Sequence, residues 1–420
     1  MPEADTELSK ERILVLGAGI SGLSTALLLQ ARGYQVTIIS EYRALNQKLL
    51  PDNPLVPTDY AMASAYPHNL KVENLEKISA DSQRIFKNLE DQNFAGLHRY
   101  RIYEVFEVNN PEDSPASPPL NEHRINFEKF SGTEYELKAA GLNVPARPDA
   151  GLLEGWRFES YFVDMPLYMQ ELWRIFELNG GSYQERTIDR DFIEKLPPGA
   201  RAINCLGLGS VDLFNDKSEC LIMRGSQLIV EGAPMVKDED GMPLAYNYTP
   251  TREVYQRADG RPEYLHFFPR EDGWILGQTR EPGRLDESNN FIGDEVIGDR
   301  FEQNGYAIPL AIPLLNHEIL SHWQALSKEE FKTTARVGYR YYRDPEDTGV
   351  RLEVDPDLAS EDIILVHNYG HGGSGITMSW GCSARAVALM EKNGASVSNS
   401  DSKVHSIGSP LDKILDGIEL

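Results

Sequence analysis

Apolar residues form an unbroken run near the start of the chain and then recur at helical spacing. Residues 13–16 are all apolar, which is typical of a parallel strand that helices cover on both faces. Leu23, Leu27 and Leu28 follow with the spacing of one helix face, and residues 34–40 return to a strand pattern. This order predicts a strand, a helix and a second strand, the core unit of an α/β nucleotide-binding domain.

The same order of elements returns near the C-terminus. Residues 363–366 are mainly apolar, a glycine-rich stretch follows, and residues 378–391 have helical periodicity. Because this second unit lies so far along the chain, we expect the nucleotide-binding domain to be discontinuous. We also assign to that domain a strand that ends at Val163 and strands at residues 183–188 and 202–206.

Short strands bounded by glycine and proline occupy the middle of the chain. They are predicted at residues 105–108, 227–230, 264–268 and 274–276. Such a series favours an antiparallel sheet. Helices are predicted at residues 74–93 and 167–176, the second with Asp164 as its N-cap and Pro166 in its first turn. Residues 109–121 contain four prolines and are expected to form an exposed loop.

Three glycines directly after the first strand have the spacing of a dinucleotide-binding turn. Gly17 suits a turn that other residues would strain, Gly19 lets backbone approach a pyrophosphate, and Gly22 allows close packing of helix on strand. The helix N-terminus then offers unpaired N–H groups to the phosphates. Glu41 lies about 20 residues further on, where an acid binds a ribose 2′-hydroxyl and repels a 2′-phosphate. A purely structural glycine turn is the alternative, but the strand before it, the helix after it and the acid at this distance favour dinucleotide binding. The acid at position 41 favours FAD or NAD over NADP.

Composition narrows the classes of partner. The 420 residues include 41 Lys and Arg against 65 Asp and Glu, a formal net charge of −24, so nucleic acid and anionic membranes are poor partners. The three cysteines lack metal-ligand spacing. Residues 1–11 are polar, no apolar run approaches 18 residues, and residues 417–420 are not an SKL-type address, so we expect a cytoplasmic protein. A homodimer is compatible with the sequence.

Two further segments have the small residues that let a ligand approach backbone. Residues 58–67 are rich in small side chains, with an ordinary surface loop as the alternative, and residues 370–377 contain five glycines or serines before the C-terminal helix. His367 and His371 are four residues apart, but the intervening and following glycines prevent the regular helix that would bring them together on a metal. No metal site is therefore predicted.

The fingerprint at residues 17–22, together with residues 367–377 and the Trp380-Gly381-Cys382 sequence, resembles the D-amino-acid oxidase family. Residues 155–156, 203–205 and 224–225 also occur in family order, so the resemblance covers nearly the whole chain. It implies non-covalently bound FAD. The candidate cofactor-binding residues are Gly17, Ala18, Gly19, Ile20, Ser21, Gly22, Glu41, Thr58, Ser64, Ala65, Ile188, Gly207, Gly372, Gly373, Ser374, Gly375, Ile376 and Thr377.

The predicted fold is α/β, a discontinuous Rossmann-type FAD-binding domain with an interleaved, mainly antiparallel β-sheet substrate domain. The FAD-binding domain is expected at residues 1–105, 155–222 and 345–395, and the substrate domain at residues 106–154 and 223–344. Residues 396–420 are expected to form a polar C-terminal tail. A helix that begins after Gly375 is expected to direct its positive end at the flavin.

The resemblance also implies an arginine for the substrate α-carboxylate. In the family this arginine belongs to a Gly-x-Arg motif, which residues 338–340 match, so Arg340 is the candidate. A planar guanidinium forms two parallel hydrogen bonds with a carboxylate and fixes its orientation. The family commonly has proline next, where this chain has Tyr341. A structural ion pair is the alternative role, and Arg336, Arg343 and Arg351 are the rival candidates.

Five other residues complete the candidate catalytic set. They are Gly373, Tyr66, Tyr264, His266 and Arg280. Tyr264 and His266 lie on the strand that carries the family's active-site tyrosines, whereas Tyr66 replaces a glutamine of the vertebrate oxidases. Arg280 follows a segment that resembles the one in which D-aspartate oxidases place an arginine for the side-chain carboxylate, with a solvated surface charge as the alternative.

The implied reaction is oxidation of a D-amino acid by FAD and dioxygen to an imino acid and hydrogen peroxide, followed by hydrolysis to a 2-oxo acid and ammonia. The partners are thus a small amino acid and dioxygen. An acidic D-amino-acid oxidase is an equal alternative. Oxidation of glycine, an imino acid or a biosynthetic intermediate is a third, and a non-catalytic flavin-binding regulator is a fourth, which the presence of Arg340 disfavours.

Overall fold

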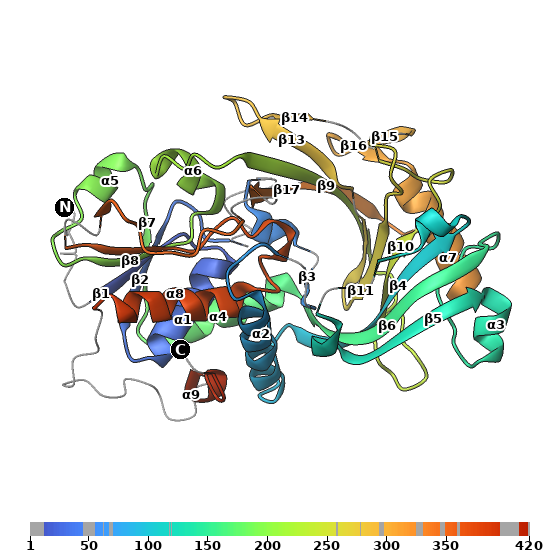
Figure 1. Cartoon of the computed structure of the whole chain (residues 1–420), viewed down its shortest axis with the longest axis horizontal. Helices are drawn as coiled ribbons and strands as arrows, with labels where there is room; N and C mark the ends of the chain where they lie inside the picture. The colour runs from blue at the N-terminus through green and yellow to red at the C-terminus, as the bar shows by residue number, and fades with distance from the viewer. Residues whose placement is uncertain are drawn as a thin grey trace.

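The computed structural model has two large sheets that lie next to each other (Figure 1). Residues from both sides line a cavity. The structure describes residues 12–44, 55–61, 63–66, 70–116, 118, 120–257, 259–277, 279–293, 298–324, 331–344, 349–358, 362–394 and 411–418. The expectations for residues 1–11, Met62, Pro67, Gln278 and most of the C-terminal tail fall outside these ranges. None of the described helices is long and apolar enough to cross a bilayer.

The smaller sheet has five parallel strands in the order β18-β8-β1-β2-β7. Its strands are β1 (Arg12–Leu16), β2 (Gln35–Ser40), β7 (Ser182–Glu185), β8 (Arg201–Asn204) and β18 (Ile364–His367). The apolar run of β1 serves both faces of the sheet: Ile13 and Val15 join one buried cluster, and Leu14 and Leu16 join another. The predicted nucleotide-binding core is therefore confirmed in its order and its strand type.

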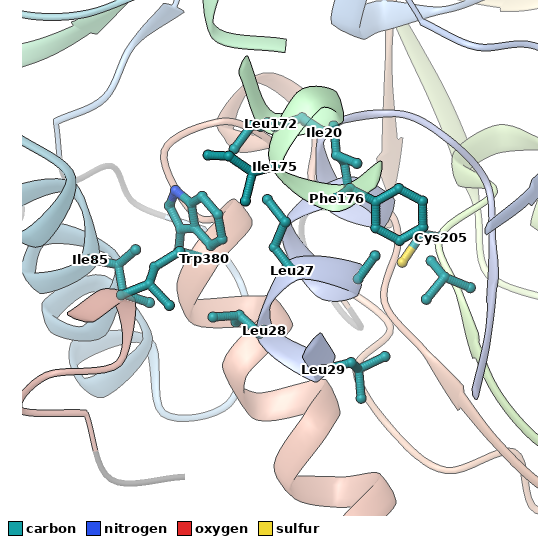
Figure 2. Packing of buried hydrophobic residues seen from close by; sticks show 14 of the residues in the cluster. Ile20, Leu27, Leu28, Leu29, Ile85, Leu172, Ile175, Phe176, Cys205 and Trp380 are labelled. Atoms are coloured by element: carbon teal, nitrogen blue, oxygen red, sulfur yellow. The ribbon is translucent and has the colours of Figure 1, made fainter. Parts of the chain in front are cut away.

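Helices cover both faces of this sheet. On one face α1 (Ile20–Ala31) lies against α4 (Met165–Leu178) and α8 (Ser379–Lys392), and α2 (Leu75–Glu90) packs on α8. Figure 2 shows Leu27 and Leu28 of α1 among Trp380 of α8 and Phe176 of α4. On the other face, Phe192 and neighbours in α5 (Arg190–Glu194) and α6 (Ser210–Leu213) cover Leu14 and Leu16. The sheet is thus held rigidly between two apolar layers.

The larger sheet has eleven strands and is mainly antiparallel. Its order is β14-β13-β9-β12-β11-β10-β4-β6-β3, with β17 on β9 and β5 on β6, and β10 pairs with β4 in parallel. The strands are β3 (Ala63–Ser64), β4 (Leu97–Val108), β5 (Ile125–Thr133), β6 (Leu152–Val163), β9 (Cys220–Glu231), β10 (Leu244–Thr249), β11 (Leu265–Arg270), β12 (Gly273–Gly277), β13 (Glu281–Leu285), β14 (Phe291–Gly293) and β17 (Thr333–Arg343). The predicted α/β architecture with an interleaved antiparallel sheet is confirmed.

Smaller elements complete the outer side of the larger sheet. Ile312, Ile319 and Trp323 of α7 (Ala311–Gln324) are buried against it. The hairpin β15 (Arg300–Gln303) and β16 (Tyr306–Pro309) forms a separate two-stranded sheet. A capping box between Thr133 and Glu136 begins α3 (Glu134–Ala139). The opposite face of the sheet carries a second apolar cluster, which includes Tyr66 and Phe268 of the cavity lining.

Two local expectations for residues 155–164 are corrected by the structure. The strand that ends at Val163 pairs along its whole length with β4 in the larger sheet, and not with the FAD-binding sheet. The hydrophobic pattern of a strand shows which of its faces is buried, but it does not identify the neighbouring strand. This is why the strand was assigned to the wrong sheet. The predicted divisions after residues 105 and 222 accordingly fall inside the continuous strands β4 and β9. Asp164 occupies the N-cap of α4 as expected, but its side chain makes no capping hydrogen bond.

The end of the chain is also less polar in structure than its composition predicts. Leu411 and Ile414 of α9 (Leu411–Ile414) are buried against α1 and α2. The side-chain amide of Asn88 donates to the carbonyl oxygens of Ile414 (3.2 Å) and Asp416 (3.0 Å). Residues 411–418 of the predicted tail therefore form part of the packed domain. Two apolar residues three apart are too few for a periodic signal.

Candidate active site

A cavity of about 660 Å³ lies between the two sheets and brings together most of the predicted site. Its lining includes Ile20, Thr58, Ser64, Tyr66, Tyr264, His266, Arg280, Arg340, Gly372, Gly373, Ser374, Gly375, Ile376 and Thr377. Cofactor candidates from the smaller sheet and substrate candidates from the larger sheet thus face one space. An apolar cleft with a few converging polar groups, placed between two domains, is the usual form of a binding site.

The other cofactor candidates lie along the carboxyl edge of the smaller sheet. Gly17, Ala18, Gly19, Ser21 and Gly22 belong to the turn and first helical residues after β1, and Ala65 follows β3. Glu41, Ile188 and Gly207 come after β2, β7 and β8, respectively. Because the carboxyl ends of parallel strands meet at one edge, all of these residues except Ala65, which follows β3 of the larger sheet, belong to the same edge of the smaller sheet.

The geometry of the first glycine turn fits a dinucleotide. A Cβ atom on Gly17, whose φ is +107°, would lie 2.5 Å from the carbonyl oxygen of Cys205, and one on Gly22 would lie 2.0 Å from that of Gly17. The N-cap residue of α1, Gly19, has no side chain to cap the helix, and no acidic residue occupies the first turn. The backbone N–H of Ile20 donates to the Thr58 hydroxyl at 3.2 Å. A tight turn thus leads into a helix end suited to a pyrophosphate.

The second glycine loop is packed on the strand that carries Arg340. Gly372 has φ +56°, and a Cβ atom there would lie 2.2 Å from the Tyr342 ring. The loop forms a 3-10 turn, Gly372–Ser374, and α8 begins only at Ser379, so the helix does not start directly after Gly375 as expected. Strand β17 contacts this loop. The strand that carries the candidate substrate arginine is therefore in direct contact with the loop that carries candidate cofactor-binding residues.

The two histidines of this region have amide and carboxylate partners. His367 is bonded to Asn204 (2.9 Å) and Asp355 (2.8 Å), and His371 donates from Nε2 to Asn368 Oδ1 (3.0 Å). Burial lowers the pKa of His371 to about 4, which keeps the ring neutral. Within the described part of the chain, no group of three potential ligands could hold a metal. These histidines instead support the loop between β18 and α8.

Arg340 lies on the inner face of β17 with its guanidinium in the cavity. Nη2 donates to the carbonyl oxygen of Thr279 at 2.8 Å. A Cβ atom on Gly225 of the neighbouring strand would lie 2.4 Å from this Nη2, so the glycine makes room for the guanidinium. No carboxylate pairs with it among the described residues. Arg340 therefore presents a planar donor group to a ligand in the cavity.

The rival arginines are placed differently. Arg336 is exposed. Arg343 lies on the opposite face of β17, where it pairs with Asp216 at 2.6 Å and donates to the carbonyl oxygen of Gly349. Arg351 pairs with Glu353 at 2.7 Å. None of the three lines the cavity described above.

Arg280 is also directed into the cavity. Its guanidinium carbon lies 3.8 Å from the centre of the Tyr264 ring, a cation–π contact. The residue is exposed and lines the cavity, so its guanidinium can be reached by a ligand there. A further arginine, Arg257, lines the same cavity and pairs with Asp259 at 3.2 Å. Sequence analysis did not identify it as a site residue. Only its place in a charged turn before the predicted strand could have indicated it.

Asn247, which sequence analysis did not identify, connects Tyr66 and His266 along one wall of the cavity. The Asn247 amide donates to the Tyr66 hydroxyl at 2.9 Å, and its oxygen accepts from Nδ1 of His266. Burial raises the pKa of Tyr66 well above its ordinary value, so the phenol is neutral. Glu104 also faces the cavity and pairs with Arg124 at 3.2 Å. This wall is polar but fixed by its own hydrogen bonds.

Comparison with known proteins connects this geometry to a family. Residues 12–389 match the family model described as FAD dependent oxidoreductase. The chain is 25% identical over 393 residues to a D-amino-acid oxidase of Dictyostelium discoideum, covering 91% of this chain and 92% of the relative. It is 27% identical over 418 residues to a D-aspartate oxidase of Homo sapiens, covering 96% and 98%.

Solved structures show the same fold at low identity. A glycine oxidase from Geobacillus kaustophilus superposes with a TM-score of 0.60 at 13% identity, covering 93% of this chain and 97% of that one. A fructosamine oxidase from Aspergillus fumigatus gives a TM-score of 0.60 at 17% identity, covering 92% and 88%. The chain thus shares its fold with these two oxidases, and the specificity of the site depends on its own side chains.

Proposed function

Because the chain belongs to the family of FAD-dependent oxidoreductases and acts on amino acids with FAD as cofactor, we propose that its substrate is a D-amino acid with a second carboxylate. The products are an imino acid and hydrogen peroxide, and water converts the imino acid to a 2-oxo acid and ammonia. One observation carries this proposal: Arg257 and Arg280 line the same cavity as Arg340.

The balance of charge in the cavity supports an acidic substrate. Of the described residues, four charged ones line the cavity, and three of them are arginines. The fourth, Glu104, already pairs with Arg124, and Arg257 pairs with Asp259, so Arg280 and Arg340 are the two lining charges for which the described residues supply no ion-pair partner. A guanidinium taken out of water without a partner costs several kcal/mol, so a substrate that brings one carboxylate for Arg340 and another for Arg280 is favoured over a neutral one.

The side chains of the cavity would act mainly by orientation. Arg340 holds the α-carboxylate in a plane, and Arg280, supported by the Tyr264 ring, holds the side-chain carboxylate. Two fixed points and the glycine loop at residues 372–375 as a third boundary together restrict which face of Cα is turned to that loop. FAD, when bound, supplies the hydride acceptor and passes the electrons to dioxygen. Tyr66 and His266 shape the opposite wall and exclude water from the reacting carbon.

A neutral D-amino acid is the second candidate, because part of the lining is apolar. Leu221, Met223 and Phe268 face the cavity beside the arginines. A side chain without charge could bury its apolar surface there at about 25 cal/mol per Å². Glycine, imino acids and other amines offer less to this surface and none offers a partner to Arg280.

Peroxide release from the purified flavoprotein tests the proposal. We expect the highest kcat/KM for D-aspartate or D-glutamate, lower values for D-alanine, D-methionine, glycine and D-proline, and no turnover of L-aspartate. Arg280→Met should remove the acidic preference but keep turnover of neutral D-amino acids. Arg284→Met, which changes an exposed arginine of β13, is the matched control. Faster turnover of D-methionine than of both acidic substrates by wild type would reject the proposal.

A further inference from the structure

Glu263 is a buried carboxylate that contacts the backbone on both sides of the acidic-substrate site. It is 0% exposed. One oxygen accepts from the backbone N–H of Tyr264 at 3.0 Å, and the other accepts from the backbone N–H of Arg280 at 3.0 Å. These two residues are the ones whose side chains stack in the cavity. A single side chain thus fixes both halves of that stack.

The two hydrogen bonds close a hairpin where its regular ladder ends. β11 and β12 are paired from Arg270↔Gly273 to His266↔Gly277, and Tyr264 and Arg280 lie beyond the last pair. Without a ladder, these backbone N–H groups would need another acceptor or would separate. Glu263 provides that acceptor, so it extends the closed part of the hairpin to the edge of the cavity.

The residue before Arg280 is fixed to the other substrate arginine. The Thr279 carbonyl oxygen accepts from Nη2 of Arg340 at 2.8 Å, and its hydroxyl accepts from the backbone N–H of Ser226 at 3.0 Å. Thr279 is itself fully buried. Arg340 is therefore hydrogen-bonded to the residue directly before Arg280, and the distance between the two guanidiniums depends on how this segment is held.

A carboxylate is the side chain that this position requires. Each N–H is bonded to a different oxygen of Glu263, and an amide in the same orientation would place its NH₂ donor group against one of the two N–H donors. Burying a carboxylate is costly, and burial raises the pKa of Glu263, whereas the N–H groups and the positive charge of Arg280 act in the opposite direction. This cost indicates a positional role, because an apolar side chain would stabilise a simple turn at less expense.

We propose that Glu263 is a positioning residue that sets the spacing between Arg340 and Arg280 and so selects the length of the dicarboxylic substrate. This inference rests on the proposed function. Since neither arginine touches Glu263 through its guanidinium, the residue acts by fixing backbone, and not by binding substrate. A site with a fixed spacing distinguishes a four-carbon from a five-carbon D-dicarboxylate, whereas a loosened one accepts both.

The test compares kcat/KM for D-aspartate, D-glutamate and D-alanine in wild type, Glu263→Gln and Glu263→Asp. Gln keeps the size but loses one acceptor, and Asp keeps both oxygens but is one methylene too short to reach both N–H groups. We expect wild type to favour one dicarboxylate at least tenfold and each variant to reduce that ratio at least fivefold, through KM. The kcat for D-alanine and the FAD content should stay within twofold of wild type.

The control and a second measurement separate this role from a structural one. Glu107→Gln removes a buried carboxylate that bonds Tyr248 and Arg147 outside the cavity, and it should leave the substrate ratio unchanged. Calorimetric binding of succinate and glutarate, the non-reactive dicarboxylates with the carbon chains of aspartate and glutamate, should show the same loss of length discrimination in the Glu263 variants.

The outcomes distinguish this inference from the proposed function. If wild type prefers dicarboxylates and Arg280→Met abolishes that preference, but both Glu263 variants keep the wild-type ratio, only the positioning role is wrong. A wild type that does not distinguish the two lengths, or variants that fail to load FAD, would also overturn it. If wild type prefers D-alanine to both dicarboxylates, the proposed function is wrong, and the positioning role that rests on it is wrong as well.

Discussion

Nη2 of Arg340 donates a hydrogen bond of 2.8 Å to the carbonyl oxygen of Thr279, the residue that precedes Arg280. This bond uses one of the five guanidinium donors and leaves the others for a ligand. It also fixes the plane of the group, because a guanidinium held at one edge has little rotational freedom left. The α-carboxylate site is therefore preorganised before any substrate enters.

This relationship predicts the effect of removing Arg340. Arg340→Leu should lower kcat/KM by at least a hundredfold, since loss of a charged, oriented contact costs about 3–5 kcal/mol. Arg340→Lys should rescue only part of the rate, because an ammonium restores the charge but not the planar pair of donors. FAD content should remain normal in both variants, as measured by absorbance after denaturation.

Arg336→Leu is the control for this prediction, since it removes an exposed arginine from the same strand. Anaerobic bleaching of the flavin by saturating substrate reports the chemical step without dioxygen. If Arg340→Leu is bleached as fast as wild type, another residue binds the carboxylate, and the assignment of Arg340 is wrong.

Gly225 gives an independent test of the same site. A Cβ atom at this position would lie 2.4 Å from Nη2 of Arg340, which is the far end of a flexible side chain. Gly225→Ala should therefore displace the guanidinium with little loss of stability, and raise KM for amino acids at least tenfold while FAD content is unchanged. The measurement is steady-state peroxide release together with a thermal melt.

Gly209→Ala is the matched substitution, because a Cβ atom there meets only an ordinary contact at 3.8 Å. It should change neither KM nor the melting temperature appreciably. Wild-type KM in Gly225→Ala would contradict the position of Arg340 described here, whereas a large fall in melting temperature would show that backbone, and not the guanidinium, had moved.

The sequence predicts those parts of the molecule that depend on neighbours along the chain. The strand, turn and helix at residues 12–31 can be inferred because the apolar run, the glycines and the helical spacing all lie within one short segment. The unit at residues 364–392 follows for the same reason. Arg340 could be proposed because its motif is also local.

What the sequence does not reveal depends on pairing between distant segments. The sequence of β6 predicts a strand, but its pairing with β4 is a property of the folded chain, so its assignment to the FAD-binding sheet was wrong. Glu263 and Asn247 look like ordinary polar residues because only the hairpin and the neighbouring strand bring their partners within reach. Arg257 is 23 positions before Arg280, so no short motif contains both.

The buried histidine next to the second glycine loop predicts how stability changes with pH. Burial lowers the pKa of His371 to about 4, while an unfolded histidine titrates near 6.5. Between these values the unfolded chain binds a proton that the folded chain does not, so the free energy of unfolding decreases as pH falls from about 6.5 to about 4. At 1.36 kcal/mol per pH unit, the full loss from this one group is about 3 kcal/mol.

Urea unfolding at several pH values and a constant FAD concentration measures this loss. His371→Gln keeps a donor for Asn368 Oδ1 but cannot titrate, so its stability should depend less steeply on pH over this window. The dependence should not vanish, because burial also lowers the pKa of His367 and adds a change of the same sign. The exposed His317 supplies the control, His317→Gln, which should follow wild type. A His371→Gln variant that loses stability as steeply as wild type between pH 6.5 and 4.5 would show that the His371 ring is not held neutral in the folded protein.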